Sequence, residues 1–163
     1  MKAKLAGKTQ LEPKKKKRIG DLMVAQGIVT QGQLQQALKR QSQVGGHIGS
    51  ILIEMGYLSI EQLLKFLSQQ TGVPSLNLYK YNINERIVSL IPIDKINSLK
   101  ALPVAANENV VTVAMVNPHD FEAISEIGFL LGKKVKPVVV PSFMMDAAKK
   151  SLFQKASSGL RGK

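Results

Sequence analysis

The sequence predicts an α+β fold: tandem helical hairpins made of four short helices, followed by a small α/β unit with about three strands. Two observations lead to this prediction. Residues 18–41 are repeated, at an offset of 29 positions, by residues 47–70, and both copies have the apolar spacing of amphipathic helices. After a break at residues 71–74, short apolar runs typical of strands alternate with helical segments.

The repeat preserves glycines and polar residues as well as apolar positions. The identical pairs are Ile19/Ile48, Gly20/Gly49, Gly27/Gly56, Gln33/Gln62, Leu34/Leu63, Leu38/Leu67 and Gln41/Gln70. Apolar identities alone would indicate only that helices repeat, whereas a packed helix face needs neither Gly nor Gln. The duplicated set therefore favours a ligand with two equivalent halves.

Each copy predicts one helical hairpin. In the first copy, a helix from Ile19 to Gln26 ends at Gly27, and a second helix continues to about Val44, where the glycine pair 45–46 breaks it. Thr30, with Gln33 three residues later, predicts a capping box at the start of that second helix. The second copy predicts helices from Ile48 to Met55 and from Ser59 to Gln70, with Gly56 between them and Ser59 and Gln62 as the capping box.

The second half of the chain predicts strands and helices in alternation. Helices are expected at 85–90, 94–99, 120–131 and 142–154, and strands at 102–106, 110–115 and 135–140. Asp94 follows Pro92 and is expected to cap its helix, and Gly132 is expected to end the helix before it.

The positive charge is concentrated at the ends of the chain. The formal net charge is +12, yet residues 19–148 carry ten basic and ten acidic side chains. We therefore divide the chain into a disordered basic tail (1–17), a helical ligand-binding subdomain (18–72), an α/β subdomain (73–155) and a flexible tail (156–163). Lys14–Lys17 is expected to be a solvated arm, with salt-sensitive contact to anionic lipid or nucleic acid as the alternative. The neutral body argues against a specific nucleic-acid-binding protein.

Composition and spacing exclude several other classes. The chain has no Cys, which excludes disulfides and thiolate metal sites. No apolar run approaches the roughly 18 residues that span a bilayer, and no apolar stretch follows the N-terminal lysines as in a signal peptide. We therefore expect a cytoplasmic protein that is not an integral membrane protein.

The sequence does not predict an enzyme. Its two histidines, His47 and His119, have no metal-ligand partners at a recognised spacing, and His119 is expected in a surface turn. Residues 128–133 have three residues between their glycines, where a phosphate loop needs four. We therefore expect no catalytic residues, no metal site and no cofactor.

The start and end of each copy hold the candidate ligand-binding residues. Gly20 and Gly49 lie in the first turn of a predicted helix, where unpaired backbone N–H groups attract an anion and the missing Cβ lets it approach. Arg18 can stack on a purine or donate to phosphate, and Gln41 and Gln70 can pair with a base edge. The alternative is that the glycines permit tight helix packing and that Gln41 is an exposed helix end.

Residues 18–41, the five-residue spacer and residues 47–70 closely resemble the tandem motif of the MshEN domain, the N-terminal region of secretion and type IV pilus ATPases of the GspE/PilB kind. Leu102-Pro103-Val104, residues 111–118 and Gly132-Lys133-Lys134-Val135 resemble the α/β part of that region. The resemblance covers about residues 18–154. It implies a receptor module that binds cyclic di-GMP, with one motif for each half of the pseudo-two-fold ligand.

By this resemblance, Arg18 and His47 would contact the guanines and Gly20 and Gly49 would admit the ligand close to the backbone. Gln41 and Gln70 would read a base edge, and the apolar motif positions would supply apolar contact and helix packing. The implied binding set is Arg18, Ile19, Gly20, Leu22, Met23, Leu34, Leu38 and Gln41 in the first copy, and His47, Ile48, Gly49, Ile51, Leu52, Leu63, Leu67 and Gln70 in the second. His47 stands where the family often has a more basic residue, and Asn117 where it commonly has Asp.

Two functional interpretations remain open from the sequence. One is a cyclic di-GMP receptor linked to type II secretion or type IV pilus assembly. The other is an N-terminal module that docks onto secretion or pilus assembly proteins without binding nucleotide. The chain also ends where the ATPase of the family would begin, so it is either a fragment of a larger ATPase or a stand-alone module.

Overall fold

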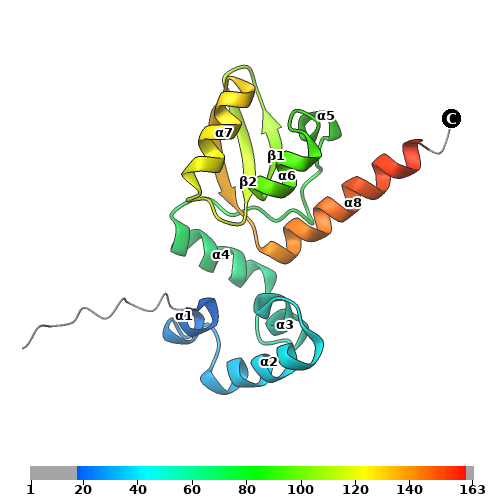
Figure 1. The fold of residues 1–163 in the computed structure, drawn as a ribbon. Helices are drawn as coiled ribbons and strands as arrows, with labels where there is room; N and C mark the ends of the chain where they lie inside the picture. Colours follow the sequence, from blue (N-terminus) through cyan, green and yellow to red (C-terminus); the bar gives the residue numbers. More distant parts are fainter. Residues whose placement is uncertain (1–17, 161–163) are drawn as a thin grey trace, which may run out of the picture.

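The computed structural model describes residues 18–160, with side chains for residues 18–155 (Figure 1). The basic tail expected at residues 1–17 lies outside the described residues. Four helices come first: α1 (Ile19–Ala25), α2 (Gln31–Val44), α3 (Ile48–Glu54) and α4 (Ile60–Thr71). The two helical hairpins predicted from the repeat are confirmed, to within a residue or two at each helix end.

Two short helices, a sheet and two further helices follow. They are α5 (Glu85–Val88), α6 (Ile93–Leu99), β1 (Ala101–Ala106), β2 (Val110–Met115), α7 (Phe121–Leu131), β3 (Lys134–Val139) and α8 (Ser142–Leu160). The α+β fold class and the three strands are confirmed. No helix of residues 18–160 is long and apolar enough to cross a membrane.

The sheet has the order β1-β2-β3, with β1 antiparallel and β3 parallel to β2. A parallel pair needs a crossover connection, and α7 supplies it. Pro103 and Pro137 both lie in edge strands, where a missing N–H need not break a ladder, whereas the central strand β2 contains no proline. The positions of the prolines are thus consistent with β1 and β3 as the edge strands and β2 as the central strand.

Three helix boundaries differ from the predictions. Helix α5 ends at Val88 rather than at Leu90. Asp94 is not a cap: α6 begins at Ile93 after Pro92, whose carbonyl accepts from the Ile96 N–H at 3.0 Å. Asp94 lies in the first turn instead, where its charge still favours the helix dipole. Helix α8 continues to Leu160 rather than ending at Gln154. Extending an existing helix adds one backbone hydrogen bond per residue, so weak helix formers can be included.

The buried residues form two hydrophobic clusters. One lies among α1–α4 and includes Met23, Leu52 and Phe66, and the other surrounds the sheet and includes Ile96, Met115 and Met144. Helix α4 lies between α1–α3 and the sheet layer (Figure 1). Phe143, at the start of α8, packs against both clusters. Because Phe143 connects the two clusters, their presence does not by itself establish separate subdomains, and the division at residue 72 stays a prediction.

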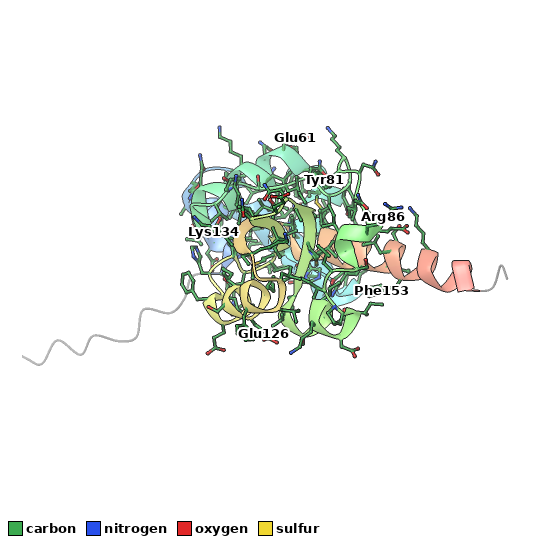
Figure 2. All side chains as sticks on the ribbon, turned by 90° about the horizontal axis from the view of Figure 1, so that it is seen from above. Glu61, Tyr81, Arg86, Glu126, Lys134 and Phe153 are labelled. Atoms are coloured by element: carbon green, nitrogen blue, oxygen red, sulfur yellow. The ribbon has the colours of Figure 1, made fainter. Side chains whose placement is uncertain are left out.

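The C-terminal part of α8 extends beyond the other elements in both views (Figures 1 and 2). Its first half is anchored, since Met144 and Met145 are buried against the sheet layer. On the α/β layer, Lys95 on α6 forms an ion pair with Glu126 on α7. The anchored start of α8 adjoins the second copy of the repeat.

Candidate functional site

The four N-terminal helices begin in two different ways. Helices α2 and α4 have complete capping boxes, in which Thr30 and Ser59 accept from the Gln33 and Gln62 N–H groups at 3.1 and 3.0 Å. Helices α1 and α3 begin after Arg18 and His47, and neither side chain makes a capping hydrogen bond. The first-turn N–H groups of these two helices are therefore left for water or a ligand.

Several repeated residues have local structural roles. Gln33 and Gln62 complete the capping boxes by accepting from the N-cap N–H groups, each at 2.9 Å. Gly27 and Gly56 end their helices with φ angles of 71° and 78°, a conformation that L side chains rarely adopt. The duplication of these four positions follows from the backbone and needs no ligand.

Gly20 and Gly49 are buried and make room for a leucine of the following helix. A Cβ on Gly20 would lie 2.6 Å from Leu34 Cδ1, and one on Gly49 would lie 3.3 Å from Leu63 Cδ2. The packing interpretation of these glycines is therefore supported directly. It does not exclude ligand contact, because both glycines also line a cavity.

The first cavity, of about 560 Å³, lies at the start of α1. Its walls come from the beginning of the first motif, from α2 and from the start of α3, and they are Arg18, Ile19, Gly20, Asp21, Leu34, Leu38, Gln41 and Ile48. Leu38 is 39% exposed here, although it belongs to the apolar face of α2. Arg18 forms no salt bridge with any described residue, so its charge is available to an anion.

The second cavity, of about 240 Å³, lies at the corresponding place in the second copy. It is lined by Ile19, His47, Ile48, Gly49, Leu63, Leu67, Val116, Val140, Pro141, Ser142 and Phe143. Positions 19/48, 20/49, 34/63 and 38/67 of the repeat thus face cavities in both copies, with Ile19 and Ile48 shared by both cavities. The two cavities are neighbours, and equivalent residues of the repeat line both of them.

His47 is held from α8. Its Nδ1 lies 3.0 Å from Ser142 Oγ and its Nε2 lies 3.4 Å from Asp146 Oδ2. Its side chain is 49% exposed, so the ring remains open to solvent. Arg18, its counterpart in the first copy, has no such support among the described residues.

The two terminal glutamines differ. Gln41 lines the first cavity, and its Nε2 donates to the Gly46 carbonyl at 2.9 Å, so the amide helps to close the spacer between the copies. Gln70 is exposed and lines neither cavity. The structure therefore brings only the first of the two predicted glutamines to one of these cavities.

The remaining predicted residues contribute packing. Met23, Ile51 and Leu52 are buried in the helical cluster, and Leu22 packs against it. None of the four lines either of these two cavities. The predicted set did not include Asp21, which adjoins Gly20 in the first cavity. Nor did it include the residues at the second cavity that follow β2 and β3 or begin α8. Asp21 could have been found by its place in the motif, whereas the others leave no periodic signal in the sequence.

Comparisons with known proteins agree with the resemblance. The family model of the MshEN domain matches residues 71–159. The type IV pilus assembly ATPase PilB of Thermus thermophilus is 35% identical over 123 residues, which are 74% of this chain and 14% of that protein. The PilB of Myxococcus xanthus is 31% identical over 122 residues, which are 75% of this chain and 22% of that protein. The chain thus spans less than a quarter of these relatives.

This chain is also similar to a solved structure described as MshE with cdg, with 33% sequence identity and a TM-score of 0.55. The alignment covers 83% of this chain and 99% of the solved chain. The family model matches only the part that follows the repeat. Because residues after 70 are little more than half of the chain, the match to MshE must extend into the repeat. The chain belongs to the MshEN domain family.

Proposed function

We propose that this domain binds cyclic di-GMP, with one half of the ligand at each cavity. The observation that carries the proposal is the pair of neighbouring cavities lined by equivalent residues of the repeat, with Ile19 and Ile48 common to both. A pseudo-two-fold ligand needs two equivalent half-sites at short range. The similarity to MshE, solved with cdg, supports this choice of ligand.

In this proposal the charged side chains at the helix starts meet the polar parts of the ligand. Arg18 stacks on one guanine or donates to phosphate, and His47 takes the equivalent place in the second half-site. Leu38 and Leu67 contact the apolar faces of the bases, and Gln41 pairs with a base edge from the first cavity. The first-turn N–H groups of α1 and α3 add positive potential.

We propose that this module has a regulatory role and not a catalytic one. Among the described residues there is no cluster of metal-ligating side chains, and the sequence contains no phosphate loop. The chain corresponds to a small part of the pilus assembly ATPases that it resembles. We propose that it passes a cytoplasmic nucleotide signal to pilus or secretion assembly.

Isothermal titration calorimetry with cyclic di-GMP, GTP and cyclic AMP tests the ligand. Cyclic di-GMP should bind with one ligand per chain, and the mononucleotides should bind far more weakly because each leaves one half-site empty. A hundredfold excess of cyclic di-GMP over its Kd should stabilise the fold by about 2.7 kcal/mol. A folded sample whose melting curve is unmoved by saturating cyclic di-GMP would refute the proposal.

A protein-docking module is the second candidate, and a separate observation favours it. Phe121 and Phe129 on α7 are 69% and 93% exposed, far from the usual burial of aromatic side chains. Binding to an assembly protein that is lost in Phe129→Ala, with no affinity for cyclic di-GMP, would establish docking without nucleotide.

A further inference from the structure

The two half-sites differ in what surrounds them. The walls of the first cavity come from residues 18–48 alone. The second cavity is closed on one side by Val116, by Val140 and Pro141, and by Ser142 and Phe143 at the start of α8. The second half-site is therefore built jointly by the repeat and by the α/β part of the chain.

His47 makes its two hydrogen bonds across this junction. A carboxylate can only accept, so His47 Nε2 must be the donor to Asp146 Oδ2, whether the ring is neutral or charged. In the neutral ring, Nδ1 then accepts from the Ser142 hydroxyl. The two contacts together determine both the tautomer of the ring and its orientation.

The supporting side chains stand on a rigid base. Ser142 and Asp146 are four residues apart on α8 and so lie on the same face of the helix. Between them, Met144 and Met145 are buried, at 0% and 1% exposure, and Phe143 packs against both hydrophobic clusters. A side chain held by an anchored helix is suited to orient a binding residue.

We propose that Ser142 and Asp146 are positioning residues of the cyclic di-GMP site, acting through His47. This inference rests on the proposed function. Arg18 reaches the first half of the ligand as a free guanidinium, whereas His47 is presented to the second half by α8. The second half-site is then complete only while the start of α8 is packed against the repeat.

A double-mutant cycle on cyclic di-GMP affinity tests the proposal. Asp146→Ala should raise the Kd by about three- to fivefold, the scale of an exposed ion pair. In the His47→Ala background the same change should have almost no effect, because there is no ring to position. Glu122→Ala removes an exposed carboxylate from α7 and controls for net charge, and Asp146→Asn, which keeps an acceptor, should recover part of the loss.

Each failure has its own meaning. An equal loss from Asp146→Ala with and without His47, or no loss in the wild-type background, would overturn the positioning role. A gain in affinity would show instead that the carboxylate repels the ligand, and this would overturn the proposal as well. Absence of cyclic di-GMP binding by the wild-type chain would refute the proposed function.

A ligand-free measurement tests the positioning separately. In ¹⁵N spectra of the wild-type chain, the neutral ring of His47 should carry its proton on Nε2. Asp146→Ala should convert this to a mixture of tautomers, while Glu122→Ala leaves it unchanged. A His47 tautomer that does not respond to Asp146→Ala would overturn the inference whatever the outcome of the binding experiments.

Discussion

The position that a Cβ atom would occupy on Gly20 lies 2.6 Å from Leu34 Cδ1, closer than carbon atoms approach in a packed interior. The equivalent separation between Gly49 and Leu63 Cδ2 is 3.3 Å. Both glycines bring the first helix of a hairpin down onto a leucine of the second. The same close approach places the first turns of α1 and α3 at the cavities.

Gly20→Ala should therefore lower the free energy of unfolding by about 1–3 kcal/mol, the usual range for an overpacked core. Gly49→Ala should cost less, because its neighbour needs to move only a few tenths of an ångström. Urea unfolding measures both. Gly32→Ala is the control, because Gly32 is exposed within α2 and the nearest atom to an added Cβ would be Thr30 Oγ1, at 3.9 Å. This change should stabilise the chain by roughly 0.5–1 kcal/mol. Equal stability of the Gly20 and Gly32 variants would contradict the packing role.

Leu34 and Leu38 should separate stability from binding. Leu34 is 2% exposed, so Leu34→Ala should cost about 2–5 kcal/mol of unfolding free energy. Leu38 is 39% exposed in the first cavity, and Leu38→Ala should instead weaken cyclic di-GMP binding roughly tenfold with little loss of stability. Val44→Ala, at an exposed position outside both cavities, should change neither. An unaltered affinity of Leu38→Ala would remove Leu38 from the site.

Arg18 should matter more for affinity than His47. Arginine is planar and permanently charged, so Arg18→Ala should cost roughly 1.5–3 kcal/mol of binding free energy, measured by calorimetry. His47→Ala should cost less, because the ring is smaller and its nitrogens already contact Ser142 and Asp146. Arg18→Lys keeps the positive charge but removes the planar guanidinium, so it shows which of the two properties the affinity depends on. Equal losses at the two positions would contradict this asymmetry, and no loss at either would favour the docking module.

Substitutions of the capping residues, unlike Arg18→Ala, should lower the stability of the fold. Thr30→Ala and Ser59→Ala each remove a complete capping box and should each lower the unfolding free energy by about 1 kcal/mol. Arg18→Ala removes no capping hydrogen bond and should leave that free energy nearly unchanged. Thermal unfolding without ligand compares the three, with Thr30→Ser as the conservative control. A large destabilisation by Arg18→Ala would show that its role is structural.

Deletion of residues 1–16 should leave cyclic di-GMP affinity unchanged, because both copies of the repeat lie beyond them. It should weaken the binding to DNA and to anionic vesicles, since it removes basic side chains while residues 19–148 carry no net charge. Filter binding and vesicle sedimentation at low and high salt measure this. Unchanged, salt-sensitive DNA binding by the shortened chain would mean that residues 1–16 do not carry this interaction.

The sequence by itself determined the hairpins, their caps and the strands. These features depend on residues close together in the chain: Thr30 with Gln33, Ser59 with Gln62, and the glycines that end helices. The same local rules failed at Asp94, where Pro92 had already set the start of α6, and at the end of α8, where an established helix continued past its weak helix formers.

The repeat also pointed to most of the residues that line the two cavities, because equivalent positions of the two copies occupy equivalent places in the fold. Only the tertiary structure decided that Ile19 and Ile48 serve both cavities, that Gln70 serves neither, and that α8 closes the second. Ser142 and Asp146 meet His47 across 95 and 99 residues of chain. Contacts of that range arise from the packing of α8 between the two clusters, and they leave no periodicity by which the sequence could reveal them.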